Sequence, residues 1–317
     1  MSSTNLPLLS IVVPCFNEES TIMPFLEESE QALAKMADIR AEIIFVDDGS
    51  TDSTLEIIKS IKSRYADIRW VSFSRNFGKE SALLAGLEAA KGDYVTLMDA
   101  DLQDPPSLLP ELLKAVRDEG YDSAGTRRST RKGEPVIRSW FARRFYRLMN
   151  AISEIELVDG ARDYRLFTRN AVNALLSLRE YNRFSKGLFS WIGFKTKWFE
   201  YENIERVAGT TKWSFFKLFH YSIESIIAFT TTPLVLSAMV GCLMMFASII
   251  CAVVLAARQM IYHNSVTGWT SMVIIIMALS GMQLFFFGII GQYIAKMYME
   301  TKRRPLYIVR QSSDQQR

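Results

Sequence analysis

Two long runs without charged side chains near the C-terminus constrain this chain more than any other feature. Residues 233–257 and 270–295 contain no Asp, Glu, Lys or Arg. As helices rising 1.5 Å per residue, the runs would be about 37–39 Å long, which exceeds the roughly 30 Å hydrocarbon core of a bilayer. The sequence therefore predicts a transmembrane hairpin, with helices at 232–257 and 270–295, rather than two buried core helices.

The distribution of positive charge predicts the orientation of this hairpin. The link at 259–269 contains no Lys or Arg, whereas the segment 296–317 carries several, including Lys296, Lys302, Arg303, Arg304 and Arg310. Because positive segments stay on the cytoplasmic side, we expect residues 1–211 to form a cytosolic domain and 296–317 a cytosolic tail. Between them, 212–231 mixes aromatic and basic residues and is expected to be an amphipathic juxtamembrane helix.

Composition narrows the class of protein further. The net charge of +3 at pH 7 gives no reason to expect a nucleic-acid partner. The first apolar run, residues 8–13, is too short for the hydrophobic region of a signal peptide. Cys15, Cys242 and Cys251 are too scattered for a disulfide framework or a metal site, and we expect all three to be buried as small apolar residues.

Short strands and helices alternate over the first 126 residues. Strands are expected at 9–13, 42–46, 68–73, 94–98 and 123–126, with helices at 20–36, 51–65, 79–90 and 106–119. This alternation predicts an α/β, Rossmann-like fold with a mostly parallel sheet and helices on both faces. Ligands of such sheets bind at the carboxyl ends of the strands, so polar residues that follow the strands are the candidates for chemistry.

The sharpest candidate site is the sequence DADLQDPP at 99–106, directly after the fourth expected strand. The carboxylates of Asp99 and Asp101 can converge on one hard cation, beside Gln103. Mg²⁺ or Mn²⁺ held there would bind substrate phosphates and neutralise a departing diphosphate. Asp-x-Asp pairs also occur in ordinary solvated loops, so the position at a strand end is what favours a metal site.

Two further loops at strand ends carry groups that suit a nucleotide. Asp48, in the sequence DDGS at 47–50, can accept an N–H bond from a base, although these residues can equally form a turn with a helix cap. After the first strand, the segment containing Pro14, Phe16 and Glu18 supplies an aromatic ring and an acid that could flank a base and a ribose.

Together these segments resemble a known family. VVPCFNEE (12–19), VDDGSTD (46–52), SRNFGKE (74–80) and DADLQDPP (99–106) are similar to family 2 glycosyltransferases with the GT-A fold, in the polyprenyl-phosphate branch that includes dolichol-phosphate mannosyltransferases. GARDYRLFTRNAV (160–172), RFSKGLFSWIGFKT (183–196), ERVAGTTKWSFFKLF (205–219) and KRRPLYIV (302–309) resemble the bactoprenol (undecaprenyl-phosphate) glucosyltransferases of bacterial cell-envelope modification. The resemblance covers about residues 8–309.

The resemblance implies three groups of site residues. The nucleotide-binding group is Pro14, Phe16, Glu18, Asp48 and the phosphate-facing Arg127. The metal group is Asp99, Asp101 and Gln103. The catalytic group is Asp101, Asp163 at the sugar, and Arg206 and Lys212, which grip the lipid phosphate. Arg162 departs from the pattern, since relatives tend to have a small residue at its position.

The implied reaction is inverting transfer of a hexose, most readily glucose from UDP-glucose, to undecaprenyl or another polyprenyl phosphate, with Mg²⁺ or Mn²⁺. An acceptor phosphate is already largely dianionic at pH 7, so we expect Asp163 to orient the sugar or support its developing positive charge rather than remove a proton. The resemblance also implies a multi-pass protein of the bacterial inner membrane, forming a homo-oligomer and working with a separate flippase and a downstream glycosyltransferase.

Several alternatives predict different features. Mannose from GDP-mannose, or a modified sugar, would use nearly the same frame. A processive polysaccharide synthase carries a Gln-x-x-Arg-Trp motif, whereas the only Arg-Trp pair here, Arg69-Trp70, has Ala66 at the Gln position. A non-catalytic membrane scaffold or flippase subunit would have no need of the paired acids.

Overall fold

One sheet organises the chain in the computed structural model, which describes residues 6–129, 136–153, 155–202, 226–262 and 268–316. Its eight strands lie in the order β7-β5-β6-β4-β1-β2-β3-β8. The strands are β1 (Leu8–Cys15), β2 (Arg40–Asp47), β3 (Ala66–Phe73), β4 (Tyr94–Leu97), β5 (Ser123–Arg128), β6 (Ala161–Thr168), β7 (Thr196–Tyr201) and β8 (Val309–Ser312). The helices are α1 (Ile22–Leu33), α2 (Thr54–Ser60), α3 (Lys79–Ala89), α4 (Leu109–Arg117), α5 (Val136–Ile152), α6 (Arg169–Ser177), α7 (Ser185–Trp191), α9 (Thr232–Tyr262) and α10 (Trp269–Thr301).

The central strands pair in parallel, as the alternating pattern predicts. β1 pairs in parallel with both β2 and β4, and β2 pairs in parallel with β3. β1 and β2 are almost continuously apolar because helices cover both faces of the sheet. One core cluster joins the sheet to α1, α2 and α4, and a second joins its opposite face to α3, α6 and α7. The α/β fold and the mostly parallel sheet are thus confirmed.

Strand β6 runs against its neighbours and thereby shapes the edge of the sheet. It pairs antiparallel with β4, where Leu97 lies opposite Arg165, and antiparallel with β5. The amino end of β6 consequently lies beside the carboxyl end of β4. Residues just before Arg165 and just after Leu97 are brought to the same place, although about 65 positions separate them in the sequence.

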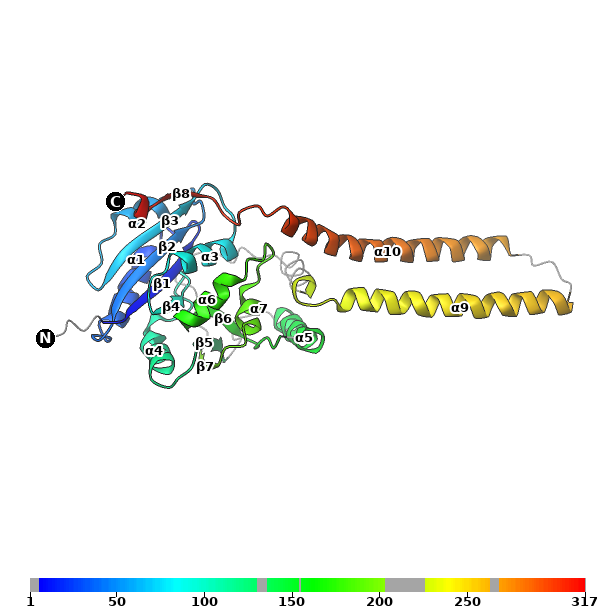
Figure 1. Ribbon diagram of the computed structural model, residues 1–317, viewed down its shortest axis with the longest axis horizontal. Coiled ribbons are helices and arrows are strands. Elements are labelled where there is room, and N and C mark those ends of the chain that lie inside the picture. The colour runs from blue at the N-terminus through cyan, green and yellow to red at the C-terminus, as the bar shows by residue number, and fades with distance from the viewer. Residues whose placement is uncertain (1–5, 130–135, 154, 203–225, 263–267, 317) are drawn as a thin grey trace.

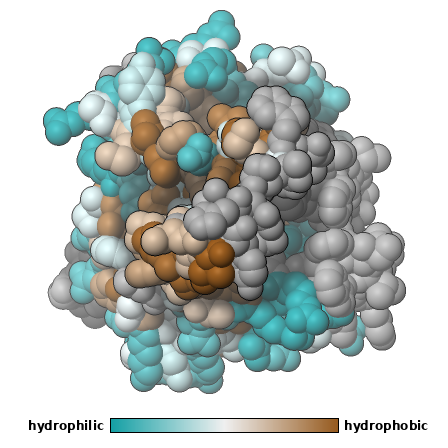
Figure 2. Space-filling model, turned by 90° about the vertical axis from the view of Figure 1, so that its right-hand side faces the viewer, coloured by the Kyte–Doolittle hydropathy of each residue, from teal (hydrophilic) through white to brown (hydrophobic). Residues whose placement is uncertain are grey.

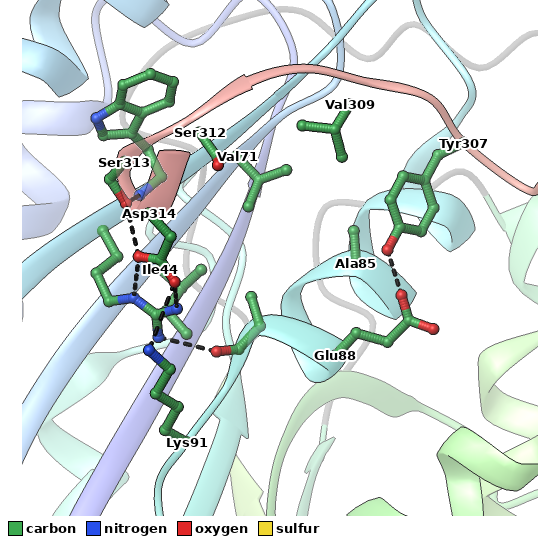
Figure 3. Close-up of a pocket in the computed structure, with 13 residues that line it drawn as sticks. Ile44, Val71, Ala85, Glu88, Lys91, Tyr307, Val309, Ser312, Ser313 and Asp314 are labelled. Atoms are coloured by element: carbon green, nitrogen blue, oxygen red, sulfur yellow. Dashed lines mark hydrogen bonds and ion pairs between the residues drawn. The ribbon is translucent and has the colours of Figure 1, made fainter. Parts of the chain in front are cut away.

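The end of the chain returns to the sheet. The sequence predicts only a tail at 296–317, whereas in the structure β8 pairs antiparallel with β3 and covers an edge that would otherwise expose unpaired backbone groups. The Asp314 carboxylate lies 2.6 Å from Arg69 Nη2. Figure 3 shows Asp314 and Tyr307 over the pocket that this segment covers, with the Tyr307 hydroxyl donating to Glu88.

Two long helices project from the domain side by side (Figure 1). Their segments Thr232–Leu255 and Ile275–Thr301 are long and apolar enough to cross a membrane. At the domain end of the pair, the Tyr293 hydroxyl donates to the Thr230 carbonyl oxygen over 2.8 Å. Viewed along the helices, apolar residues gather near the middle of the view, with hydrophilic residues above, below and to the left of them (Figure 2).

The burial expected of the three cysteines is only partly correct. Cys15 is buried at the end of β1, but Cys242 and Cys251 are exposed on α9. α9 packs against α10 along one side, so its remaining surface has no protein partner among the described residues and faces outward. The apolar character of these two cysteines therefore suits a lipid environment rather than a protein core.

Candidate active site

Two acids and a lysine meet where β4 and β6 end. Asp99 lies two residues after Leu97, and Asp163 lies two residues before the paired Arg165, so the antiparallel register carries them together. Lys79, the first residue of α3, places its Nζ 2.7 Å from Asp99 Oδ1 and 2.6 Å from Asp163 Oδ2. Three segments that are distant in the sequence thus supply one charged cluster, which we call the Lys79 cluster.

The charges of the Lys79 cluster stabilise one another. Burial alone would lower the pKa of Lys79, but the neighbouring charges of Asp163 and Asp99 outweigh it and raise that pKa. Burial likewise opposes ionisation of Asp163, yet the Lys79 charge holds the pKa of this carboxyl well below its usual value. Asp163 is therefore ionised at neutral pH and is a weak proton acceptor.

Glu80 follows Lys79, and its pKa is raised, unlike that of Asp163. Burial raises its pKa to about 7, although its carboxylate accepts hydrogen bonds from the Ser185 amide, at 3.0 Å, and from the Ser185 hydroxyl. These bonds attach the start of α3 to the start of α7. The sequence contains Lys79 and Glu80 within SRNFGKE, but no pattern in it indicates which strands their side chains meet.

In the loop after β4, the backbone of Gln103 bonds to Asp101 while its side chain lies beside two arginines. Leu102 adopts a left-handed backbone with φ 57°, an uncommon conformation for a residue other than glycine. The Gln103 amide N–H donates to Asp101 over 3.1 Å, while its side-chain Oε1 accepts from Arg128 at 3.2 Å and lies 3.5 Å from Arg162. The Gln103 side chain therefore faces two guanidinium groups, and its role at the metal stays a prediction.

The acids nevertheless suit a divalent cation. Within the described ranges, no group of three or more His, Cys, Asp or Glu side chains is arranged to hold a metal. Mg²⁺ is commonly held by one or two carboxylates together with substrate phosphates and water, and Asp99 and Asp101 can supply that part. Lys79 occupies one side of Asp99 and would have to yield some of that contact to the cation.

A buried ion pair fixes the last residue of the loop at 99–104. Asp104 is 1% exposed and accepts a 2.8 Å hydrogen bond from Arg162 Nε and a further bond from the Tyr201 hydroxyl. An unpaired carboxylate at this depth would be costly, which explains why a large basic residue stands at 162. The family resemblance singles out Arg162, but the sequence contains no sign of its partner Asp104.

The loops predicted to bind a nucleotide are held by their own acids. The two oxygens of Asp48 accept backbone N–H bonds from Phe77 at 2.6 Å and Gly78 at 2.9 Å. Burial raises the pKa of Asp48, and these N–H groups oppose the rise. Asp48 therefore anchors the segment that leads into Lys79, in addition to any contact that it makes with a base.

The other predicted nucleotide residues lie at the same edge of the sheet. Pro14 is the second-last residue of β1 and lies opposite Val46 of β2, and Phe16 and Glu18 come just after the end of β1. Thr21 donates to the Glu18 carboxylate over 2.9 Å. Arg127 instead pairs with Glu200 of β7, because successive residues of a strand point to opposite faces; its neighbour Arg128 is the one that reaches Gln103.

Two predicted acceptor residues, Arg206 and Lys212, lie outside the residues that the structure describes, as does most of the predicted juxtamembrane helix at 212–231. The described site therefore consists of the Lys79 cluster, the loop at 99–104 and the arginines beside it.

The acids lie at the switch between parallel and antiparallel strands, where sheets of this kind bind their ligands, and this is the arrangement expected of a glycosyltransferase with the GT-A fold. Residues 10–176 match the family described as Glycosyl transferase family 2, and the chain belongs to that family.

Curated relatives match nearly the whole chain. The prophage bactoprenol glucosyl transferase homolog of Escherichia coli (strain K12) is 36% identical over 95% of this chain and 98% of its own length. The bactoprenol glucosyl transferase of Shigella phage SfII is 36% identical over 96% of this chain and 98% of its own length. The putative glycosyltransferase CsbB of Bacillus subtilis (strain 168) is 42% identical over 96% of this chain and 92% of its own length. Among solved structures, glucosyl-3-phosphoglycerate synthase from Mycobacterium tuberculosis, in complex with Mn²⁺, UDP-glucose and phosphoglyceric acid, is similar over 70% of this chain and 78% of its own, with 21% identity and a TM-score of 0.44.

Proposed function

We propose that this protein transfers glucose from UDP-glucose to a polyprenyl phosphate, with inversion at the anomeric carbon. The observation that supports the proposal is the Lys79 cluster at the carboxyl edge of the sheet, where the carboxylates of Asp99 and Asp163 both lie within 2.7 Å of one ammonium group. The names of two near-full-length relatives, from Escherichia coli and Shigella phage SfII, favour glucose and a bactoprenol carrier.

The proposed reaction is a single displacement. An acceptor phosphate oxygen forms the new bond to the anomeric carbon, and the bond from that carbon to the diphosphate oxygen breaks on the opposite side. Asp99 and Asp101 would hold Mg²⁺ or Mn²⁺, which supplies positive charge to the leaving diphosphate when bound. Arg128 and Arg162, which face Gln103, add fixed positive charge near the same group.

Asp163 is assigned a positioning role toward the sugar. Its depressed pKa makes it a poor general base, and a largely dianionic acceptor does not require one. A fixed negative charge at this place can orient the sugar hydroxyls and stabilise positive charge that develops at the anomeric carbon.

We propose that α9 and α10 cross the cytoplasmic membrane as a hairpin and hold the catalytic domain against its inner surface. The Lys and Arg residues after α10 and the absence of both from the link at 259–269 support this orientation. Arg206 and Lys212 stay predictions as ligands of the acceptor phosphate, and association into a homo-oligomer and cooperation with a flippase also stay predictions.

The test is synthesis of the lipid product by the purified full chain. Polyprenyl phosphate, Mg²⁺ and a panel of nucleotide sugars are incubated with the protein, and mass spectrometry identifies the lipid. We expect hexosyl polyprenyl phosphate from UDP-glucose, its loss in chelator, and its loss in Asp99→Asn but not in Asp67→Asn, which changes an exposed acid on β3. Product from GDP-mannose alone would reject the donor, and full synthesis by Asp99→Asn would reject the site.

A further inference from the structure

A groove of about 550 Å³ lies beside the C-terminal half of α5, apart from the active site. Its lining includes Arg143, Tyr146, Arg147, Asn150 and Asp159. It shares no lining residue with the Lys79 cluster or with the loop at 99–104.

The position of the groove follows from hydrogen bonds at the end of α5. The Ile152 carbonyl oxygen accepts from the Thr230 hydroxyl at 2.7 Å and from the Thr232 hydroxyl at 3.2 Å. Thr232 is the first residue of α9 and of its apolar segment, and Figure 1 shows α5 beside the start of α9. The last turn of α5 therefore lies at the level where the proposed membrane span begins.

That level corresponds to the lipid headgroups. The headgroup layer is about 5–8 Å thick on each side of the hydrocarbon core. Arg147 precedes Ile152 by five residues, so it lies at most about 8 Å from it along the helix axis. Arg143 lies one further turn away. The two guanidinium groups are thus within reach of lipid phosphates when α9 is inserted.

The charge of the groove matches one phosphate. Arg143 and Arg147 are exposed, one helical turn apart, and neither forms an ion pair within the described part of the chain. Like charges at this spacing repel, so a bound anion would relieve the repulsion. Asp159 contributes one negative charge, which leaves one net positive charge for a phosphodiester. Arginine forks suit phosphate oxygens, and Asn150 lines the groove while its side-chain amide is held by the Leu157 backbone.

We propose that this groove binds the phosphate of an anionic phospholipid in the leaflet that faces the catalytic domain, through Arg143 and Arg147. The bound lipid fixes the tilt of the domain on the membrane, because α5 buries Met149 in a cluster with Phe184, and Leu157 and Tyr146 of the groove belong to or pack against that cluster. Phe184 precedes Ser185, which donates to Glu80 beside Lys79. The lipid site is in this way attached to the active site through packed residues.

The test uses the full chain, delipidated in non-ionic detergent, and native mass spectrometry of bound lipids. Phosphatidylglycerol should bind at least about tenfold more tightly than phosphatidylcholine. The double variant Arg143→Gln/Arg147→Gln should lose that preference while keeping its melting temperature. The matched control Arg40→Gln/Lys62→Gln, which removes two exposed cations on β2 and before β3, should bind as the wild type does.

Three results would overturn the proposal. The first is equal phosphatidylglycerol binding by the double variant and the wild type. The second is full displacement of the lipid by inorganic phosphate at millimolar concentration, which would make this a site for soluble anions. The third is loss of polyprenyl phosphate binding in parallel with phosphatidylglycerol binding, which would make the groove part of the acceptor site.

Discussion

Replacing Lys79 by Met removes the charge that joins the two acids of the site while nearly keeping the length of the side chain. The Lys79 side chain is 42% exposed, and those of Asp99 and Asp163 are 23% and 21% exposed. Breaking a buried ion pair costs about 3–5 kcal/mol, whereas an exposed pair contributes about 0.2–1 kcal/mol. Two partly exposed contacts of 2.6–2.7 Å should therefore contribute about 2 kcal/mol together.

Thermal unfolding of the full chain in detergent and chelator measures this contribution. A domain of this size loses about 2–4 °C per kcal/mol, so the Lys79→Met variant should melt roughly 4–8 °C lower. Added Mn²⁺ should recover more of the melting temperature in the variant than in the wild type, since the cation replaces the missing charge without competing with Lys79. Lys62→Met, which removes an exposed lysine, is the control.

The transfer rate provides a second measurement. Without Lys79, Asp163 loses the group that fixes its position, and we expect kcat to fall about 100-fold. Lys79→Arg keeps the charge and should retain most of the rate. The reasoning is refuted if Lys79→Met melts at the wild-type temperature in chelator and binds Mn²⁺ with unchanged affinity.

Three further changes probe the elements around the site. Burial raises the pKa of Glu80 from 4.5 to about 7, so the folded chain binds this proton more tightly than the unfolded chain. Relative to the Glu80→Gln variant, the unfolding free energy of the wild type should fall by up to about 3 kcal/mol as the pH rises between these values. Urea unfolding of both proteins at pH 5 and pH 7.5 measures this, and an equal stability difference between them at the two pH values would contradict it. Arg162→Met leaves Asp104 buried without its cation and should lower the unfolding free energy by about 3–5 kcal/mol. Adding Asp104→Leu should recover much of this stability, and equal melting temperatures of the single and double variants would argue against the ion pair. Gly49→Ala places a Cβ 2.5 Å from the Arg75 carbonyl carbon at a φ of +68°, whereas Gly120→Ala, at a φ of +73°, meets nothing within 4 Å. The Gly120 variant should lose only the roughly 1–2 kcal/mol of backbone strain, and the Gly49 variant should lose more than twice as much stability. Equal losses of melting temperature in the two variants would exclude the clash.

The sheet and its edge could be predicted from local patterns. Buried parallel strands are continuous apolar runs, and β1 and β2 are of this kind. Asp48 follows β2 and Asp99 follows the next buried strand, β4, so both can be assigned to the carboxyl edge of the sheet from the sequence. The two apolar helices were equally evident, since a charge-free run longer than 20 residues has few other uses.

Side-chain partners were not predictable, because they depend on direction and register. Arg127 and Arg128 are adjacent in the sequence, yet only Arg128 reaches Gln103, since alternate residues of β5 point to opposite faces. Leu102, directly before Gln103, takes a left-handed conformation, and the Gln103 side chain lies beside Arg128 and Arg162. Nothing local in the sequence encodes either outcome.

What the sequence determined by itself was the kind of chain: an α/β domain with acids at its strand ends and two apolar helices, each specified by residues close together along the chain. The tertiary structure alone decided the assembly of the site. Lys79 meets Asp163 across 84 positions, and β8 pairs with β3 across more than 200. Contacts over such separations depend on how several elements pack at once, so no single stretch of sequence contains them.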